Sequence, residues 1–189
     1  TITVNPTPTA SISGTTSVCQ NALSPIIPFT NPLALPITIT YHINLATQPT
    51  INLAANSTYT VAVPTTTANT YAYNLVSVAY SVGKTCITGV SATATVVVNP
   101  KPVAVATPAS QSICSSDAIT PILLNSTTPG TSYNWTRDNT VYVTGIAASG
   151  SGDISGTLTN TTSLPVTVIF TITPTANGCP GAPTTARVT

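Results

Sequence analysis

An internal repeat of about 94 residues constrains this chain most, because it sets the size of the folding unit. The segment Val4-Asn5-Pro6-Thr7-Pro8 recurs 94 positions later as Val98-Asn99-Pro100-Lys101-Pro102. Self-similarity at a fixed period indicates tandem copies of one structural unit. We therefore expect two modules, residues 6–99 and 100–189, with residues 1–5 as the end of a preceding repeat. The phase of the repeat predicts that the parent chain continues as a tandem array.

The composition favours strands in both modules. Charged residues make up 4% of the chain, against about 25% in ordinary soluble proteins. About a fifth of the residues are Thr, and Thr, Val and Ile are β-branched residues that suit a pleated sheet. Seventeen Pro and ten Gly interrupt the chain at short intervals. These features predict an all-β fold of two tandem immunoglobulin-like β-sandwich domains.

Alternating apolar and polar residues place several strands. Residues 37–45 and 59–63 alternate in this way, which predicts half-buried strands with one wet face. In residues 71–80 the apolar phase shifts, as a β-bulge would make it shift. Residues 166–172 present Val, Val, Phe and Ile on one face, whereas the glycine-rich stretch 145–156 predicts a flexible loop.

Four cysteines divide evenly between the modules. Cys19 matches Cys114 at an offset of 95, and Cys86 matches Cys179 at an offset of 93. The separations within a module, 67 and 65 positions, exclude a local CxxC redox or zinc motif. An even count with one pair per repeat predicts the disulfides Cys19–Cys86 and Cys114–Cys179, formed outside the cytosol. The alternative is four buried free thiols.

No set of residues has the spacing that catalysis or metal binding needs. His42 is the one histidine, and alternation puts it on the wet face of its strand. The carboxylates of Asp117, Asp138 and Asp153 are far apart in sequence, whereas glycosidases and calcium sites need carboxylates that converge. No Gly-x-Ser-x-Gly nucleophile elbow is present. We therefore expect no enzyme, no catalytic residues, no metal site and no cofactor.

Charge and hydropathy argue against nucleic acid and membrane partners. The net charge is +1, and the basic residues Lys84, Lys101, Arg137 and Arg187 are dispersed. Binding to nucleic acid or to an anionic membrane requires clustered Lys and Arg. No run of 18 apolar residues is present, so we expect no membrane insertion by a helix.

The aromatic residues have two possible roles, core packing or a sugar-stacking platform. Most fall on predicted inward faces, so core packing is the preferred interpretation, with Trp135 as a core plug beside the second disulfide. Tyr80 and Tyr142 are the expected exposed exceptions. A carbohydrate-binding accessory module of a secreted enzyme remains the alternative function, and ice binding through threonine ladders such as Thr38 and Thr40 is a further one.

Several segments resemble known repeats. Ile37-Thr38-Ile39-Thr40-Tyr41 and Tyr59-Thr60-Val61-Ala62-Val63-Pro64 in the first module resemble one repeat type of Bacteroidetes surface adhesins. Ser112-Ile113-Cys114-Ser115 and Asn177-Gly178-Cys179 in the second module resemble the PKD-like repeat of the same proteins. This resemblance implies export by the type IX secretion system and an extracellular filament at the outer membrane, as in the gliding-motility adhesin. It brings no catalytic residues.

The joint between the modules completes the functional hypothesis. Asn99, Pro100, Lys101 and Pro102 form a linker in which two prolines restrict the backbone torsions, so it should be semi-rigid. We expect the chain to be a structural or adhesive stalk segment of a cell-surface protein. Its expected partners are neighbouring repeats of the same chain, surface glycans, and outer-membrane secretion or motility machinery.

Overall fold

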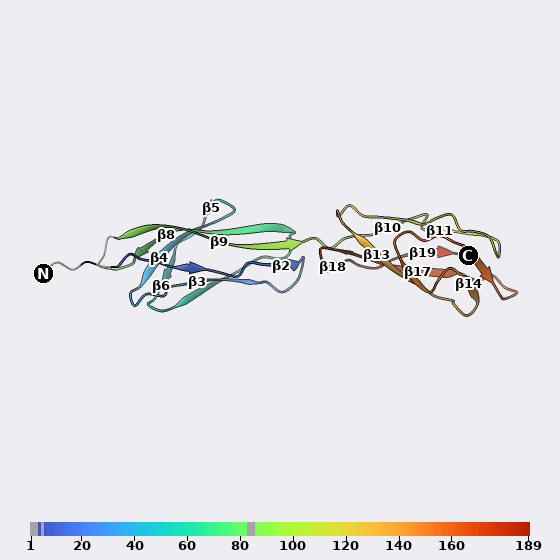
Figure 1. The fold of residues 1–189 in the computed structure, drawn as a ribbon, viewed down its shortest axis with the longest axis horizontal. Helices are drawn as coiled ribbons and strands as arrows, with labels where there is room; N and C mark the ends of the chain where they lie inside the picture. Colours follow the sequence, from blue (N-terminus) through green and yellow to red (C-terminus); the bar gives the residue numbers. More distant parts are fainter. Residues whose placement is uncertain (1–3, 5, 83–85) are drawn as a thin grey trace. The chain divides into compact units, whose positions relative to one another are not determined.

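The computed structural model describes residue 4, residues 6–82 and residues 86–189. The chain divides into two compact units, Thr1–Asn99 and Pro100–Thr189. All the regular elements among these described residues are β-strands (Figure 1). The predicted all-β fold of two tandem immunoglobulin-like sandwiches is therefore confirmed. The expected end of a preceding repeat, residues 1–5, lies outside the described residues except for Val4.

Unit 1 is a sandwich of two sheets. One sheet has the strand order β1-β3-β7, and the other has the order β2-β9-β8-β4-β5, with β6 also paired to β4. Its strands are β1 (Ser11–Ile12), β2 (Thr16–Cys19), β3 (Ile26–Thr30), β4 (Ile37–Ile43), β5 (Ala46–Thr47), β6 (Ile51–Leu53), β7 (Thr58–Ala62), β8 (Asn69–Tyr80) and β9 (Ile87–Asn99).

The first edge of unit 1 changes sheet at Gly14. Strand β1 pairs antiparallel with β3, whereas β2 pairs parallel with β9 in the opposite sheet. Gly14 between them has a φ of +99°, and a Cβ there would lie 2.7 Å from the carbonyl oxygen of Ile26. Only glycine fits this conformation and this close approach. The crossing gives both sheets a strand from the start of the module.

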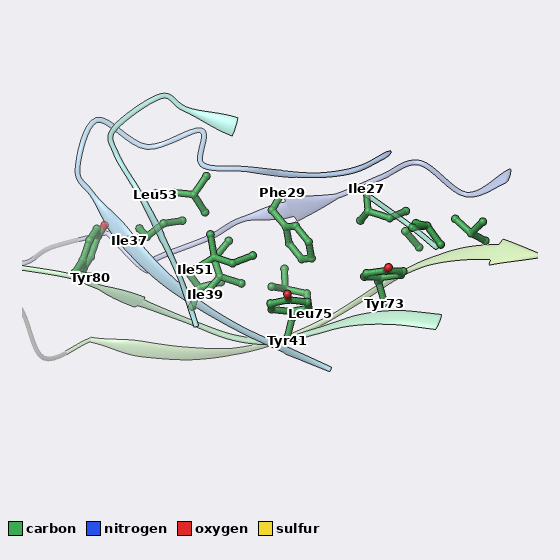
Figure 2. Packing of buried hydrophobic residues seen from close by; sticks show 14 of the residues in the cluster. Ile27, Phe29, Ile37, Ile39, Tyr41, Ile51, Leu53, Tyr73, Leu75 and Tyr80 are labelled. Carbon is green, nitrogen blue, oxygen red and sulfur yellow. The ribbon is translucent and has the colours of Figure 1, made fainter. Parts of the chain in front are cut away.

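The core of unit 1 fills the space between its two sheets. Figure 2 shows Ile27 and Phe29 of β3 pointing toward side chains of the other sheet, among them Tyr41, Tyr73 and Leu75. The rings of Phe29 and Tyr41 lie 4.9 Å apart at an angle of 57°, within the range of favourable aromatic pairs. All five side chains are buried, so this cluster holds the two sheets together.

The predicted bulge in residues 71–80 is confirmed. The pairing of β8 with β9 shifts register between Leu75 and Ser77, so Leu75 and Val78 both face the core although they are three residues apart. The predicted strand over residues 37–45 ends earlier, at Ile43. Leu45 has a φ of 69° and is exposed, because the chain turns there to begin β5.

Unit 2 repeats the design with shorter strands. Its main sheet has the order β11-β19-β17-β13-β15, and β10-β12 and β14-β16 form two further pairs. As in unit 1, the first edge strand of the main sheet runs parallel to the last strand, β19. The strands are β10 (Val105–Thr107), β11 (Ser110–Gln111), β12 (Leu123–Asn125), β13 (Ser132–Arg137), β14 (Val143–Gly145), β15 (Ser149–Ser151), β16 (Leu158–Asn160), β17 (Val168–Ala176), β18 (Cys179–Pro180) and β19 (Thr184–Val188).

Trp135 is a core residue of unit 2, as predicted. Its indole ring meets Phe170 edge-on at a centroid distance of 5.7 Å, and its cross-strand neighbour on the other side is Gly150. A Cβ at Gly150 would lie 2.8 Å from Trp135 Cε2 and closer still to Cζ2. The indole therefore occupies the space that any other residue at 150 would need. The indole Nε1 is buried without a hydrogen-bond partner.

The stretch 145–156 is more ordered than its glycine content predicts. Ser149–Ser151 forms β15, which pairs with β13. Ile154 is fully buried, and Asp153 Oδ1 accepts a hydrogen bond of 2.8 Å from the backbone N–H of Leu124. The prediction of a loop was wrong for these residues because one buried isoleucine and cross-strand backbone pairing outweigh the local composition.

Two tyrosines differ from their predicted positions. Tyr59 is 51% exposed although alternation places it inward, and Tyr80 is 6% exposed although it was expected outside. The hydroxyl of Tyr80 donates to the carbonyl oxygen of Pro6 at 3.0 Å, so the start of the module covers it. Tyr142 is exposed as predicted.

Candidate functional site: the cysteine-bearing ends of each module

The two cysteines of unit 1 lie at opposite ends of its longest strand. Cys19 pairs with Asn99, the last residue of β9, whereas Cys86 immediately precedes Ile87, the first residue of β9. A strand rises about 3.3 Å per residue, so the length of β9 separates the two cysteines by roughly 40 Å. A disulfide requires Cα atoms within about 7 Å. Unit 1 therefore cannot close a disulfide on itself.

Unit 2 separates its cysteines in the same way. Cys179 pairs with Ala176 at the end of β17. Cys114 lies beyond the other end, where the neighbouring Ile113 donates its N–H to the carbonyl oxygen of Thr189 at 3.0 Å. Val188 pairs with Val168, the first residue of β17. The length of β17 thus separates Cys114 from Cys179 by about 26 Å, again too far for a bond.

These positions correct the predicted disulfides. Cys19 and Cys179 are disulfide-bonded, whereas Cys86 and Cys114 are exposed free thiols. Neither predicted pair, Cys19–Cys86 or Cys114–Cys179, is present, and Trp135 therefore has no cystine of that kind beside it. The number of cysteines per repeat does not show at which end of the sandwich each cysteine lies, so it could not predict the pairing.

Each module has an entry end and an exit end, defined by where the chain enters and leaves it. Cys86 is at the entry end of unit 1, because the next residue, Ile87, pairs with Ala79, and the adjacent Tyr80 donates its hydroxyl hydrogen bond to the carbonyl oxygen of Pro6. Cys179 is at the entry end of unit 2, where Gly181 lies so close to the Pro102 carbonyl that no side chain would fit. Cys19 and Cys114 are at the exit ends.

The linker residues are attached to the ends of the modules. Asn99 Nδ2 donates to Ser17 Oγ at 2.7 Å, and the Asn99 carbonyl accepts from the N–H of Gln20 at 2.8 Å. Pro102 is buried, whereas Lys101 is exposed. The polar contacts of Asn99 therefore belong to the exit end that carries Cys19.

The exit end of unit 2 is hollowed beside Cys114. A cavity of about 380 Å³ opens there. Its lining mixes apolar side chains, such as Ile113, Val168 and Val188, with polar ones, such as Ser115, Asn160 and Thr162, and includes Cys114. Leu164 and Tyr142, which lie near this end, are 72% and 53% exposed.

The polar residues that sequence analysis considered for chemistry have structural roles. His42 Nε2 lies 3.3 Å from Thr47 Oγ1 across a strand pair. Asp138 Oδ1 accepts from the backbone N–H of Ile169 at 2.7 Å. Within the described ranges, no group of three or more His, Cys, Asp or Glu side chains converges as metal ligands do.

Arg137 is also used for structure. Its guanidinium donates to the carbonyl oxygens of Ile146 at 2.7 Å and Val143 at 3.0 Å. Burial lowers the pKa of Arg137, and the nearby Asp138 opposes that effect. A guanidinium held by backbone carbonyls fixes the chain around β14 and is not presented to a ligand.

Across the described part of the chain, no helix has the length and apolar character to span a membrane.

One family model matches part of the chain, within the second unit. Residues 111–189 match the PKD-like domain family. The match begins at Gln111, the second residue of β11, and includes β12 to β19 and both cysteines of unit 2. A search of the curated proteins found no match.

Solved structures give the fold of the chain. It is similar to the two-domain DIP-gamma IG1+IG2 structure, with a TM-score of 0.52, 9% identity, and coverage of 97% of this chain and 96% of that chain. A second similar structure is titled Dpr11 IG1 bound to DIP-gamma IG+IG2, with a TM-score of 0.51, 7% identity and coverage of 97% of each chain. At this identity the likeness shows the immunoglobulin-like fold alone. Disulfide-bonded cysteines, as at Cys19 and Cys179, are typical of proteins outside the cytosol.

Proposed function

We propose that this chain is a stalk segment, a pair of spacer modules from a tandem array in an extracellular cell-surface adhesin. The observation that carries the proposal is the same sandwich design in both units, including equivalent cysteines at equivalent ends. A repeated module that carries its own core and no catalytic cluster serves to build length or to present repeated surfaces.

The joint supports a spacer role. Asn99 is hydrogen-bonded to Ser17 and Gln20 of its own unit, and Pro102 is buried. Only Pro100 and Lys101 remain between these anchored residues. Because proline fixes its own φ and restricts the residue before it, we infer a short semi-rigid joint. Many such joints in series would give an extended filament.

The surface supports weak adhesion spread over many modules. With 4% charged residues, the modules present hydroxyls, amides and scattered apolar groups. Weak contacts repeated along one chain add through avidity. The partners we propose are neighbouring repeats of the same chain, surface glycans, and the outer-membrane secretion or motility machinery that the adhesin resemblance implies. Type IX export and a role in gliding belong to this proposal.

A carbohydrate-binding module is the less favoured alternative. Sugar platforms need several exposed aromatic side chains on one face. Among the described residues the large exposed aromatics are Tyr59 and Tyr142, and they belong to different units. One exposed ring in each unit does not make a platform.

Immunogold labelling of intact cells of the source organism tests the stalk. An antiserum raised against the chain should label material extending outward from the cell surface without permeabilisation. Serum pre-absorbed with the pure chain is the control. Label that appears only inside permeabilised cells would contradict the proposal. So would a parent gene that joins these two modules alone to a catalytic domain.

A further inference from the structure

The last strand of unit 1 brings a buried valine to the exit end. Val98 is 2% exposed and belongs to the core of the unit. It pairs with Val18 of β2 on one side and with Asn69 of β8 on the other. The carbonyl oxygen of the next residue, Asn99, accepts a hydrogen bond of 2.8 Å from the N–H of Gln20. Val98 and Asn99 therefore close the exit end of unit 1.

The hollow at the exit end of unit 2 lies where an equivalent valine would fit. Val188 pairs with Val168 of β17 and with Gln111 of β11. Two positions farther along the same strand, a residue would therefore lie between Val166 and Ile113. Both of these side chains line the hollow of about 380 Å³ and pack against the core. Because side chains alternate with a period of two, a side chain at that position points inward, as Val188 does.

The backbone of unit 2 already has the register for such a residue. The N–H of Thr189 donates to the carbonyl oxygen of Gln111 at 3.0 Å, and the carbonyl oxygen of Thr189 accepts from the N–H of Ile113 at 3.0 Å. In unit 1 the corresponding parallel ladder continues through Val98 and Asn99. The strand of unit 2 can therefore be lengthened in the same register without rearranging its neighbours.

A partner for the asparagine that follows the valine is also in place. In unit 1, Asn99 Nδ2 donates to Ser17 Oγ at 2.7 Å. Ser112 is the repeat equivalent of Ser17, at an offset of 95, and it lines the hollow of unit 2. The hollow thus offers apolar contacts for a valine and a hydroxyl for the next side chain.

The chain carries a second valine of the same motif, and that valine is exposed. Val4 precedes Asn5-Pro6 as Val98 precedes Asn99-Pro100. Val4 is 88% exposed, against 2% for Val98. Because the ladder bonds of unit 2 reach Thr189, the position immediately before the equivalent of Val98, a Val-Asn-Pro motif that follows Thr189 directly places its valine in the hollow.

We propose that the hollow of unit 2 is a socket for the valine of a Val-Asn-Pro motif supplied by the next repeat, as by Val4 of a second copy of this chain. The valine completes the last strand of the module before it, and the asparagine closes the exit end as Asn99 does in unit 1. The inference rests on the tandem array of the proposed function. It makes each sandwich more stable when another repeat follows it, as nearest-neighbour coupling does in repeat proteins.

The socket takes a segment that is continuous with the strand. One valine and one asparagine cannot hold two separate chains together, because specific protein–protein interfaces bury at least about 1,000 Å². Covalent continuation from Thr189 supplies the high effective concentration that so small a contact needs. The partner is therefore the segment that follows in the array, and not a free copy in solution.

The first test lengthens the full chain by three residues. Val-Asn-Pro is added after Thr189, and the matched control carries Thr-Asn-Pro, which keeps the β-branched shape and puts a hydroxyl in the hollow. Fluorescence of Trp135, the single tryptophan, follows the unfolding of unit 2 in denaturant. We expect the valine form to have a folding equilibrium constant about tenfold above that of the threonine form, which raises the melting temperature by about 6–11 °C. Equal stability of the two forms would overturn the proposal.

The second test locates the added valine. Cys114 lines the hollow and its thiol is free and exposed, so its rate of alkylation by iodoacetamide reports whether the hollow is filled. We expect this rate to fall several-fold in the valine form relative to the chain that ends at Thr189. Cys86, an exposed free thiol of unit 1, is the internal control and should react at the same rate in both. An unchanged rate at Cys114 would overturn the assignment of the hollow.

Circular dichroism of all three proteins establishes that each is folded. These outcomes are separate from the immunogold result, because a surface stalk whose modules use no such socket would still be labelled on intact cells.

Discussion

Replacement of Gly150 by alanine should destabilise unit 2 strongly. The new Cβ would lie 2.8 Å from Trp135 Cε2, whereas ordinary contacts begin near 3.4 Å. The indole cannot retreat, because its far side packs against Phe170 at a centroid distance of 5.7 Å and Phe170 is fully buried. Overpacking a closed core costs about 1–3 kcal/mol. We expect a loss of about 2 kcal/mol, which lowers the melting temperature of a domain this size by about 8–16 °C.

Trp135 itself reports the change. It is the single tryptophan of the chain, so its fluorescence during denaturant unfolding follows unit 2. Gly89→Ala in unit 1 is the control for a glycine-to-alanine change in a strand with open space, because a Cβ there meets nothing within 4 Å, and it should leave the unfolding of unit 1, followed by circular dichroism, nearly unchanged. In a Trp135→Leu background, followed by circular dichroism, Gly150→Ala should cost much less. A Gly150→Ala protein within about 0.5 kcal/mol of the parent, or an equal cost in both backgrounds, would refute the reasoning.

Three further predictions concern single side chains. Asn31→Ala should destabilise unit 1 by about 3 kcal/mol, measured by denaturant unfolding, because the fully buried Asn31 amide donates to the carbonyl oxygens of Leu35 and Ala54 at 2.9 and 2.7 Å. Thr30→Ala removes one exposed hydroxyl contact and should destabilise the unit far less. Equal losses of stability in the two variants would contradict the importance of the Asn31 hydrogen bonds. Burial raises the pKa of Tyr41 and Tyr73, and neighbouring tyrosines add to the effect. In the unfolded chain both tyrosines have the ordinary pKa near 10. The stability of the folded unit is therefore fully present below that pH and is lost as the pH rises through the raised pKa of the folded state. Thermal melts from pH 8 to 11 should show this loss and Tyr73→Phe should reduce it, whereas a flat profile would contradict the assignment. Asp138→Ala should destabilise unit 2 by about 1–2 kcal/mol, measured by Trp135 fluorescence, because the N–H of Ile169 loses its acceptor at 2.7 Å. Asp117→Ala should be nearly neutral, because the Asp117 side chain accepts no hydrogen bond from the described residues.

Sequence pattern predicts most of the sandwich because burial in a strand follows a period of two. The alternation in residues 37–43 and the phase shift near Leu75 identify β4 and the bulge in β8 correctly. Composition misleads in residues 145–156, where local glycine content says nothing about the buried Ile154 or the pairing of β15 with β13. Tyr80 is another such case, since the segment that covers it lies 74 positions away.

The cysteines show what one-dimensional spacing cannot supply. Their count and period identify the residues that form the site, but the pairing depends on which end of a sandwich each one occupies. Cys86 precedes the last strand of its module and Cys19 lies beside the end of the same strand. The length of β9 was predictable as a run of alternating residues, and the parallel pairing of β2 with β9 was not, because it arises from the crossing at Gly14.

Pulsed electron paramagnetic resonance can measure the separation of the two cysteines within one module. In the Cys114→Ser/Cys179→Ser chain, nitroxide labels on Cys19 and Cys86 should lie roughly 35–45 Å apart, as the rise of β9 requires. A distance distribution centred below about 15 Å would place the two cysteines within reach of one another. That result would contradict the claim that the module carries its two cysteines at opposite ends.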